Sequence, residues 1–506
     1  MNDLRFAFRQ LLKNPGFIAV AVFVLFWSPA AGAKSNFSVR ALSLKDCIQI
    51  ALEHNLDVKI ERFTPEIARY ELNLAYARYD PVFGGSAIHR HGFEHARNDS
   101  TNRIGTRTKS DEFRAGVVGV LPTGLSYELG GDVSNTRITD FSGRAEDSVG
   151  AASIQLRQPL LRNSWIDAAR LNIQVSKKLL RISELSLREQ IMNSVTSVEL
   201  AYYDLKLAQQ RVRVQEQALN LTEELLSANR QRVEQGVLAP LDEKQAESQV
   251  ASQRGVLLVA QRLLAAQQNV LKSLLSDNMA EWQDVLVEPT DEMTAPAAAL
   301  DRQSSWQKGL TQRPDFLQAR LNLERLGYLL KFNRNQLYPQ LDLVGSYGFS
   351  GAGREYAGVF GDIRRRDSPS YSFGAVVSIP LGNSTARNNY KISKAEQQQA
   401  LVKLKKLEQD IMLQIEDAVR LAQTNFERVG TTRLAREFAD VALQAEQTKL
   451  ENGRSTSFFV LQLQRDLTAA RTAEIQALAD YNKALAQLAL SEGSVFERNN
   501  LNLKTR

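Results

Sequence analysis

The chain has 506 residues and a formal net charge of +6. Residues 34–506 contain 60 basic and 56 acidic residues. This near balance gives no indication of a nucleic-acid partner. Cys47 is the only cysteine, so an internal disulfide is excluded. After residue 33, no apolar run reaches the 18 residues that a membrane-spanning helix needs. Only helices and closed barrels satisfy backbone groups in lipid, so any membrane span must consist of strands.

Residues 1–33 have the pattern of a cleaved secretory signal peptide. Three basic residues precede an apolar run at 17–27, and Ala31-Gly32-Ala33 supplies the small residues of a cleavage site. An apolar run this short does not span a bilayer as a helix. We therefore expect the mature chain to begin near Lys34.

Residues 34–276 are predicted to form a first structural repeat, with membrane strands within about 81–160. Segments 113–121 and 125–133 alternate in polarity and are joined by Pro122-Thr123-Gly124. The polar segments at about 92–112 and 134–149 are interpreted as exposed loops. Pro81 and Pro159 are expected to mark the junctions between strands and helices.

A long helical hairpin is predicted to complete the first repeat. Apolar residues follow a seven-residue pattern, which indicates coiled-coil packing: Ile191, Val195, Val198, Tyr202, Leu205, Val212, Leu219, Leu226 and Val233. At about 1.5 Å per residue, roughly 70 residues make a rod of roughly 100 Å. Gly236 is predicted to end this helix and Pro240 to begin the returning one.

Residues 277–307 are expected to form a linker, residues 308–490 a second repeat, and residues 491–506 a tail. Three positions recur 258 residues later: Leu52, Asp57 and Pro81 correspond to Leu310, Asp315 and Pro339. Strands are predicted at about 339–381, bounded by Pro339 and Pro380, and a second hairpin turn at Gly453. A repeat this long indicates duplication of a domain-sized unit.

The order of these segments resembles the TolC-type outer-membrane efflux proteins over almost all of residues 42–490. The similarity is carried by these segments: Tyr338-Pro339-Gln340-Leu341, Gln158-Pro159-Leu160, Ile379-Pro380-Leu381, Gly236 and Gly453. It implies a fold that combines coiled-coil helices with a transmembrane β-barrel, in a trimer whose barrel continues into an α-helical tube across the periplasm. One copy has too few strands to close a barrel, so several chains are required.

The resemblance also implies a function. It predicts an exit duct in the outer membrane for a tripartite efflux or type I secretion system. Substrate from an inner-membrane ABC or RND transporter would pass through it passively, delivered through a periplasmic adaptor. Residues 2–22 resemble the start of MacB-like ABC permeases, which favours an ABC partner.

The number of strands stays open at this point. The offset between the repeats falls from 258 at Pro81 to 221 at Pro159, so the first repeat carries about 37 extra residues between them. If these form a membrane hairpin turning at Pro122-Thr123-Gly124, each chain gives six strands and the barrel eighteen. If they extend the loops, each chain gives four strands and the barrel twelve, which the family resemblance favours.

The hairpin turns are predicted to contact the adaptor, through Gly236-Val237-Leu238-Ala239 and Gly453-Arg454-Ser455-Thr456. The resemblance places Asp242 near the periplasmic constriction, although an acidic residue in a first helical turn has an equally good structural explanation. Phe459 and Gln462 occupy the second turn's gate position, where family members carry aspartates, which puts an acidic ring there in doubt.

No catalytic motif is found: there is no P-loop, paired-cysteine site or Gly-x-Ser-x-Gly sequence, so we expect no enzymatic activity, cofactor or metal. His89, His91 and His95 suggest a metal site, but loop histidines without a scaffold are the preferred interpretation. A periplasmic adaptor or a helical scaffold remains the alternative function. Neither explains two helical hairpins with strand segments between them.

Overall fold

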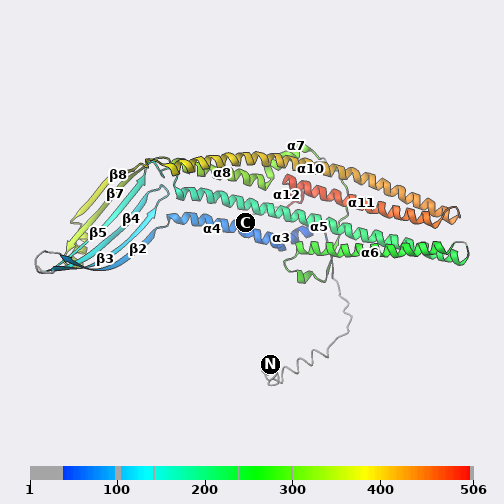
Figure 1. Ribbon diagram of the computed structural model, residues 1–506, viewed down its shortest axis with the longest axis horizontal. Helices are drawn as coiled ribbons and strands as arrows, with labels where there is room; N and C mark the ends of the chain where they lie inside the picture. The colour runs from blue at the N-terminus through cyan, green and yellow to red at the C-terminus, as the bar shows by residue number, and fades with distance from the viewer. Residues whose placement is uncertain (1–37, 97–103, 141–142, 237–238, 298–299, 502–506) are drawn as a thin grey trace, which may run out of the picture.

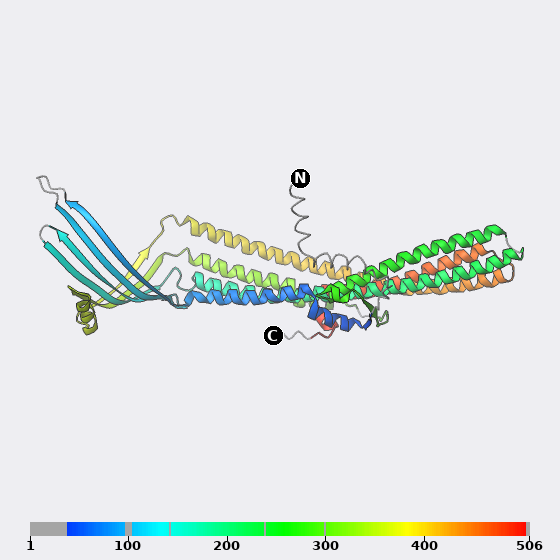
Figure 2. The ribbon, with the colours of Figure 1, turned by 90° about the horizontal axis from the view of Figure 1, so that it is seen from below.

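The protein is elongated, with a sheet at one end and long helices along the rest of its length (Figure 1). A computed structural model describes residues 38–96, 104–140, 143–236, 239–297 and 300–501. The view turned by 90° shows the strands fanning out at one end and the helical hairpins extending to the other (Figure 2). The predicted signal peptide lies outside the described residues.

The first part of the chain contains a short strand, helices, four strands of the main sheet and a helical hairpin. Its elements are β1 (Ser38–Leu42), α3 (Leu44–His54), α4 (Leu56–Tyr76), η1 (Ala77–Tyr79), β2 (Val82–Ala96), β3 (Ile104–Val120), β4 (Ser126–Asp140), β5 (Gly143–Pro159), α5 (Ala168–Glu234) and α6 (Pro240–Leu275). A short connection follows, with η2 (Met279–Trp282) and β6 (Val285–Pro289).

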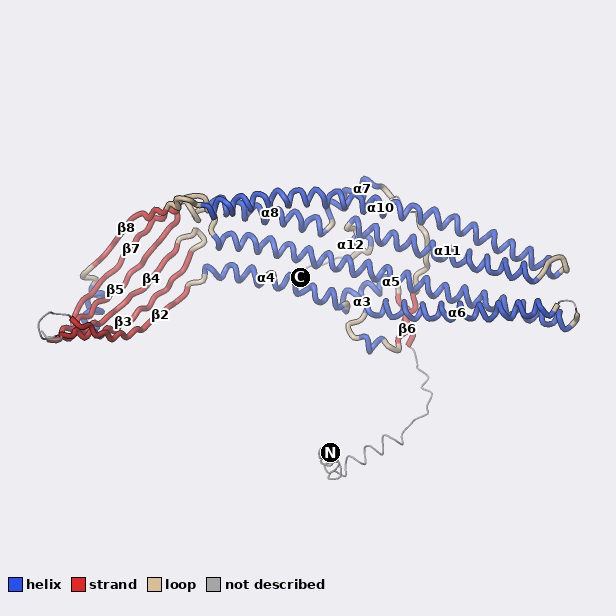
Figure 3. The backbone as a smooth tube through the Cα atoms, viewed as in Figure 1, coloured by secondary structure: helices blue, strands red, loops and turns tan. Residues whose placement is uncertain are grey.

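The second part has the same order with two strands. Its elements are α7 (Arg302–Gln312), α8 (Pro314–Asn335), β7 (Gln340–Gly353), α9 (Tyr356–Arg365), β8 (Pro369–Ser378), α10 (Ser384–Glu451), α11 (Ser457–Glu492) and α12 (Val495–Arg498). Among the described residues, the only strands away from the sheet end are the parallel pair β1–β6 beside the helices (Figure 3).

Local signals set the helix boundaries. The Asn55 side chain accepts hydrogen bonds from two backbone N–H groups in the first turn of α4, and the Asp167 side chain accepts one from Arg170 N–H in the first turn of α5. Pro240 opens α6, at a position where a missing N–H costs nothing. Gly493 ends α11 at φ +77°, a conformation that glycine adopts without strain.

The sheet contains six antiparallel strands in the order β2-β3-β4-β5-β7-β8. The expectation of four strands per chain is therefore wrong. Residues 113–133 form the end of β3, a tight turn and the start of β4, and in this turn Leu121 N–H donates to Leu125 O at 2.8 Å. The extra residues of the first repeat thus add a complete hairpin to the sheet.

The polar segments interpreted as loops are strands for much of their length. Backbone pairing between β3 and β4 continues from Val120–Ser126 to Arg107–Thr139. Charged pairs across the strands replace apolar ones there: Arg90 with Glu112, and Arg137 with Glu146, each at 2.6 Å. Opposite charges on paired strands stabilise a sheet, so high polarity did not indicate a loop.

The helices pack around an interior that follows the predicted heptads. Val198 and Leu205 of α5 are fully buried, in a cluster that includes Leu271 of α6. Beyond Val212 the buried positions shift by one residue, to Ala218 and Leu225, instead of the predicted Leu219 and Leu226. Of the described helices, none combines the length and apolar character needed to cross a membrane.

Candidate functional site

The two faces of the six-stranded sheet differ in chemistry. One face, called the apolar face here, carries large exposed apolar side chains on every strand, and the strand register places them on the same side. Its representatives are Phe83, Phe113, Leu129, Ile154, Tyr347 and Phe373. Phe373 is 84% exposed in the single chain. An apolar band of this kind is typical of strands that face lipid.

The opposite face, called the polar face, carries charged and hydroxyl side chains. One example per strand is Arg90, Glu112, Asp132, Gln155, Ser346 and Ser372. Arg90 bonds Glu112, and the hydroxyls of Ser346 and Ser372 lie 2.8 Å apart. Apolar outside and polar inside is the pattern of a water-filled barrel.

Prolines stand at the ends of the strands, where the sheet meets the helices. Pro81 precedes β2 and Pro159 ends β5, while Pro339 precedes β7 and Pro380 follows β8. The lack of an N–H group limits proline to such strand ends. The backbone continues the pairing across this boundary, where Leu160 N–H donates to Leu341 O at 2.8 Å.

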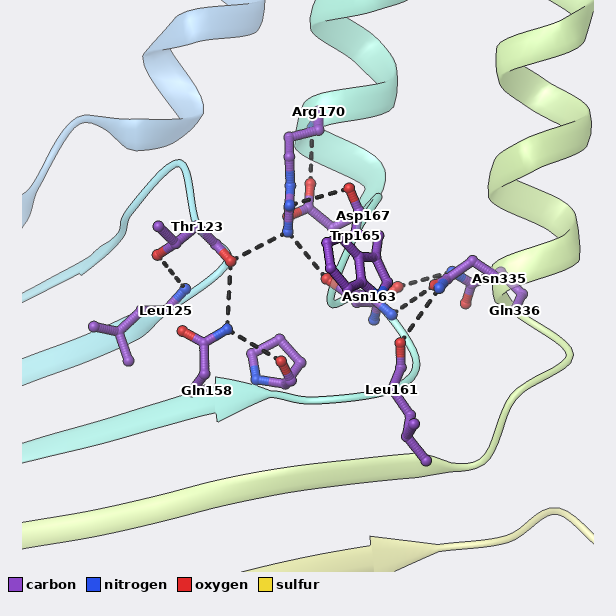
Figure 4. A network of polar contacts seen from close by, with 11 residues as sticks. Thr123, Leu125, Gln158, Leu161, Asn163, Trp165, Asp167, Arg170, Asn335 and Gln336 are labelled. Atoms are coloured by element: carbon purple, nitrogen blue, oxygen red, sulfur yellow. Dashed lines mark hydrogen bonds and ion pairs between the residues drawn. The ribbon is translucent and has the colours of Figure 1, made fainter.

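A network of polar contacts at this junction ties the added hairpin to α5 (Figure 4). The Arg170 guanidinium donates to Thr123 O at 3.3 Å, in the β3–β4 turn, and to Asn163 O at 3.1 Å. It also pairs with Asp167 at 2.9 Å. One side chain therefore links a strand turn, the connection after β5 and the first turn of a long helix.

The second repeat joins the same network. Asn335, at the end of α8, accepts a hydrogen bond from Asn163 N–H at 2.7 Å and donates to Leu161 O at 3.3 Å. Gln336 donates to the Asn163 side chain at 2.8 Å. No sequence pattern points to these residues, because uncharged amides near a helix end do not mark a junction.

At the far end of the molecule, two turns connect the paired helices. Gly236 and Gly453 have φ values of +74° and +69°. In each case no heavy atom would lie within 4 Å of an added Cβ, so the backbone conformation and not crowding requires glycine. Ala239 and Arg454 lie in the same turns, whereas Val237 and Leu238 lie outside the described residues.

Side chains close the second turn and bind it to the first hairpin. The Ser455 hydroxyl donates to Glu446 Oε1 at 2.5 Å, and Thr456 is the residue before α11. The Ser457 hydroxyl, on α11, donates to Asn229 Oδ1 on α5 at 2.9 Å. Asn229 is fully buried, so this contact fixes the two hairpins against each other.

Charged contacts hold the hairpin ends and shift pKa values. A hydrogen bond from Ser455, with help from Lys449, lowers the pKa of Glu446. In the first hairpin, Lys244 and then Arg230 lower the pKa of Glu247. Both carboxylates therefore stay ionised throughout the physiological pH range.

The proposed gate residues lie near these turns. Asp242 is half-buried in the first turn of α6. Phe459 and Gln462 are exposed on α11, and Phe459 packs edge-to-face against Phe458 at 5.7 Å. A groove between α6 and α11 lies beside them and is lined in part by Leu241, Lys244, Phe458 and Leu461.

The histidines considered as metal ligands lie in β2. His89 Nδ1 is 2.6 Å from Asp111 Oδ1 across the β2–β3 pair, and His91 is exposed. Among the described residues, no group of three or more His, Cys, Asp and Glu side chains has an arrangement that fits a metal ion.

This architecture matches a known family. A sequence model of the family described as "Outer membrane efflux protein" matches residues 47–276 and 306–494, which is most of the chain and includes both repeats. The chain belongs to the outer membrane efflux protein family. The family resemblance found in the sequence is thereby confirmed, and the alternatives of a periplasmic adaptor or a helical scaffold are excluded.

Curated relatives within the family are distant but nearly full length. The cation efflux system protein CusC of Escherichia coli K12 is 24% identical over 445 residues, covering 87% of this chain and 83% of CusC. The probable outer membrane lipoprotein SilC of Salmonella typhimurium is 24% identical over 424 residues, covering 83% of this chain and 79% of SilC.

Solved channels share the fold. The outer-membrane channel OprN matches with a TM-score of 0.67 and 18% identity, covering 89% of this chain and 90% of OprN. VceC of Vibrio cholerae matches with a TM-score of 0.65 and 16% identity, covering 89% of this chain and 96% of VceC. For the open MtrE channel of Neisseria gonorrhoeae, the TM-score is 0.61 and the identity 16%, with 92% of this chain and 90% of MtrE covered.

Membership of the efflux family locates the sheet and the helices relative to the membrane. The protein is an outer-membrane efflux channel of a tripartite system, with its strands in the membrane and its helices extending into the periplasm. Its family works with periplasmic adaptors and inner-membrane pumps. The apolar face is thus the lipid-facing side, and the polar face lines the lumen.

Proposed function

We propose that this channel is a homotrimer whose barrel contains eighteen strands and through which an inner-membrane pump exports substrate passively. The observation that carries the proposal is the six-stranded sheet, whose edges β2 and β8 have a partner on one side only within the described residues. Open edges of long, lipid-exposed strands are not stable in a membrane. Pairing of β2 with β8 of the next copy removes both edges at once.

Closure and symmetry require several copies, and the family resemblance supports three. One six-stranded sheet is too small to close, since the smallest membrane barrels have about eight strands. Cyclic assembly of identical chains through one repeated contact closes the ring. Three copies, the number that the family resemblance implies, give eighteen strands. The lumen is then wider than in a twelve-stranded barrel.

We propose that the adaptor docks on the two hairpin turns, at Gly236-Val237-Leu238-Ala239 and Gly453-Arg454-Ser455-Thr456. The adjacent groove between α6 and α11 supports this proposal, because Leu241 and Phe458 are exposed apolar side chains beside charged ones. A helical hairpin of another chain fits such a groove by inserting apolar side chains at helical spacing.

We propose that the channel opens and closes at the hairpin turns, the same end at which the adaptor docks. The Asn229–Ser457 contact joins the two hairpins, so an opening movement between them has to break or shift it, whereas the Arg230–Glu243 pair joins the two helices of the first hairpin. Asp242, Phe459 and Gln462 lie on the elements that would move, and they are the proposed gate residues. Energy for transport comes from the pump, of the ABC or RND class, and not from the channel.

A crosslinking experiment tests the assembly. Phe83 of β2 and Val377 of β8 both lie on the apolar face near the periplasmic end of their strands. Cysteines at both positions should yield covalent trimers after oxidation in outer membranes, whereas Phe83→Cys alone should not. Cys47 is buried and does not interfere. Mass measurement in mild detergent should give three copies, and a monomer would overturn the proposal.

A further inference from the structure

The helix α9, in the loop between β7 and β8, packs on the lipid-facing side of the sheet. Val359 is fully buried there against Gly150 of β5 and Gly351 of β7, which pair with each other across the two strands. Tyr356 reaches Phe113 of β3 in an edge-to-face contact at 6.1 Å. Figure 2 shows this short helix lying against one side of the sheet, at the end remote from the long helices.

Two glycines of the sheet allow this helix to pack closely. A Cβ at Gly150 would lie 2.9 Å from Val359 Cγ1, and one at Gly351 would collide with the Val359 carbonyl oxygen. Both glycines belong to the same rows as Ile154 and Tyr347, which are exposed on the apolar face. The position of α9 outside the barrel is therefore fixed by strand register.

The depth of α9 follows from strand geometry. Gly150 lies nine residues before Pro159, where β5 meets the helical part. At about 3.3 Å per residue this is about 30 Å along the strand, and a tilt of about 40° gives a height of about 23 Å. The apolar band of outer-membrane barrels is about 25 Å tall. The helix thus lies at the level of the outer-leaflet head groups.

The exposed side of α9 combines basic and apolar groups. Arg364, Arg365 and Arg366 end the helix, and all three are exposed. Arg365 pairs with Asp362 and Asp367, whereas Arg364 has no carboxylate partner among the described residues. Phe360 is 57% exposed one turn before Arg364 and so lies on the same side of the helix.

We infer that α9 binds the phosphate groups of an anionic glycolipid in the outer leaflet of the outer membrane. Arginine forms paired hydrogen bonds with phosphate oxygens, and a basic amphipathic helix in the plane of the interface places its apolar side chain among acyl chains. Arg366 is positioned for this role because its guanidinium stacks on Phe349 of the apolar face, 5.8 Å from the ring centre. The inference rests on the outer-membrane location and not on the trimer or the adaptor.

Binding of defined lipids tests this inference. The purified channel in detergent is titrated with bis-phosphorylated lipid A and with its phosphate-free form, and bound lipid is counted by native mass spectrometry. We expect the Arg364→Gln/Arg366→Gln variant to bind phosphorylated lipid A at least tenfold more weakly than the wild type. The control is Arg181→Gln/Arg433→Gln, which removes two exposed arginines of α5 and α10 and should bind normally.

Two further experiments test whether the site binds lipid or free phosphate, and whether α9 lies in the membrane or in water. Inorganic phosphate at millimolar concentration should not displace lipid A, and displacement would show a simple anion site instead. A spin label at Phe360→Cys in lipid A-containing membranes should collide more often with dissolved oxygen than with an aqueous nickel complex. Equal lipid binding by variant and wild type, or a label exposed to water, would overturn the inference.

Discussion

A buried carboxylate in the middle of the helical part makes stability depend on pH. Glu199 is 2% exposed, and its Oε2 has no hydrogen-bond partner in the described structure. Asn499 donates to Oε1 at 2.6 Å, and Arg498 lies 3.8 Å away. Burial raises the pKa of Glu199 despite these two contacts. A raised folded pKa means that ionisation of Glu199 costs stability at neutral pH.

Glu199→Gln should therefore stabilise the protein at pH 7 to 8, by about 1–3 kcal/mol, because the amide carries no charge that burial would desolvate. The difference should disappear as pH falls below the unfolded pKa of a glutamate, about 4.3, because both variants are then neutral. Thermal unfolding followed by circular dichroism in detergent measures this. A glutamine variant less stable than the wild type at pH 8 would show that the Arg498 contact dominates.

The turn glycines give a second test at the same scale. At φ +74°, Gly236→Val costs about 1–2 kcal/mol of local strain and should distort the first hairpin turn. We expect normal levels of trimer in the outer membrane, with loss of export and of crosslinking to the adaptor. Gly255→Val is the matched control, because Gly255 lies in the same hairpin, within α6, with open space at its Cβ. Normal export by Gly236→Val would place docking elsewhere.

At the scale of elements, the Arg170 network predicts a coupling between sheet and helices. Arg170→Met removes hydrogen bonds to Thr123, Asn163 and Asp167, and should cost about 1–3 kcal/mol because the side chain is largely buried. Arg181→Met is the control: that side chain is 71% exposed, and its one ion pair among the described residues is with Glu184, so the loss should stay below about 1 kcal/mol. Urea unfolding of both variants compares them, and equal midpoints would contradict the coupling.

Sequence patterns predicted the helices well, because each pattern has one physical cause. The seven-residue spacing from Ile191 to Leu205 reflects burial against neighbouring helices, and those side chains are buried. The pattern then fails because α5 changes partners along its length. Lys178 contacts Glu324 of α8 near its start, whereas Asn229 contacts Ser457 of α11 near its end. Different neighbouring helices bury different positions of α5. The sequence of α5 does not show which helices these are.

The sheet was harder to predict, because the partners of its strands are likewise not visible in the sequence. β3 and β4 alternate clearly only between residues 113 and 133, and the strands continue on both sides through charged residues. Partners such as Glu146 for Arg137 are known only once the register is known. Likewise α9 has an ordinary amphipathic sequence, and only Gly150 and Gly351 beneath Val359 show which face it covers.

At the scale of the whole molecule, the added β3–β4 hairpin should set the width of the barrel. Deletion of residues 97–142 would leave β2 and β5 as antiparallel neighbours, since β2 and β4 run in one direction and β3 and β5 in the other. Each chain then contributes four strands, and a trimer has twelve instead of eighteen. Barrel diameter grows roughly in proportion to strand number, so the deletion should reduce it by about a third.

Polymer exclusion from the extracellular side measures this width, because that side reports the barrel and not the periplasmic entrance. Polyethylene glycols of increasing size should stop entering the deletion variant at a smaller radius than the wild type, as judged by single-channel conductance. Mass measurement first establishes that the variant is a trimer, so that loss of assembly is not mistaken for narrowing. An unchanged cut-off in an intact trimer would mean that β3 and β4 do not form part of the barrel wall.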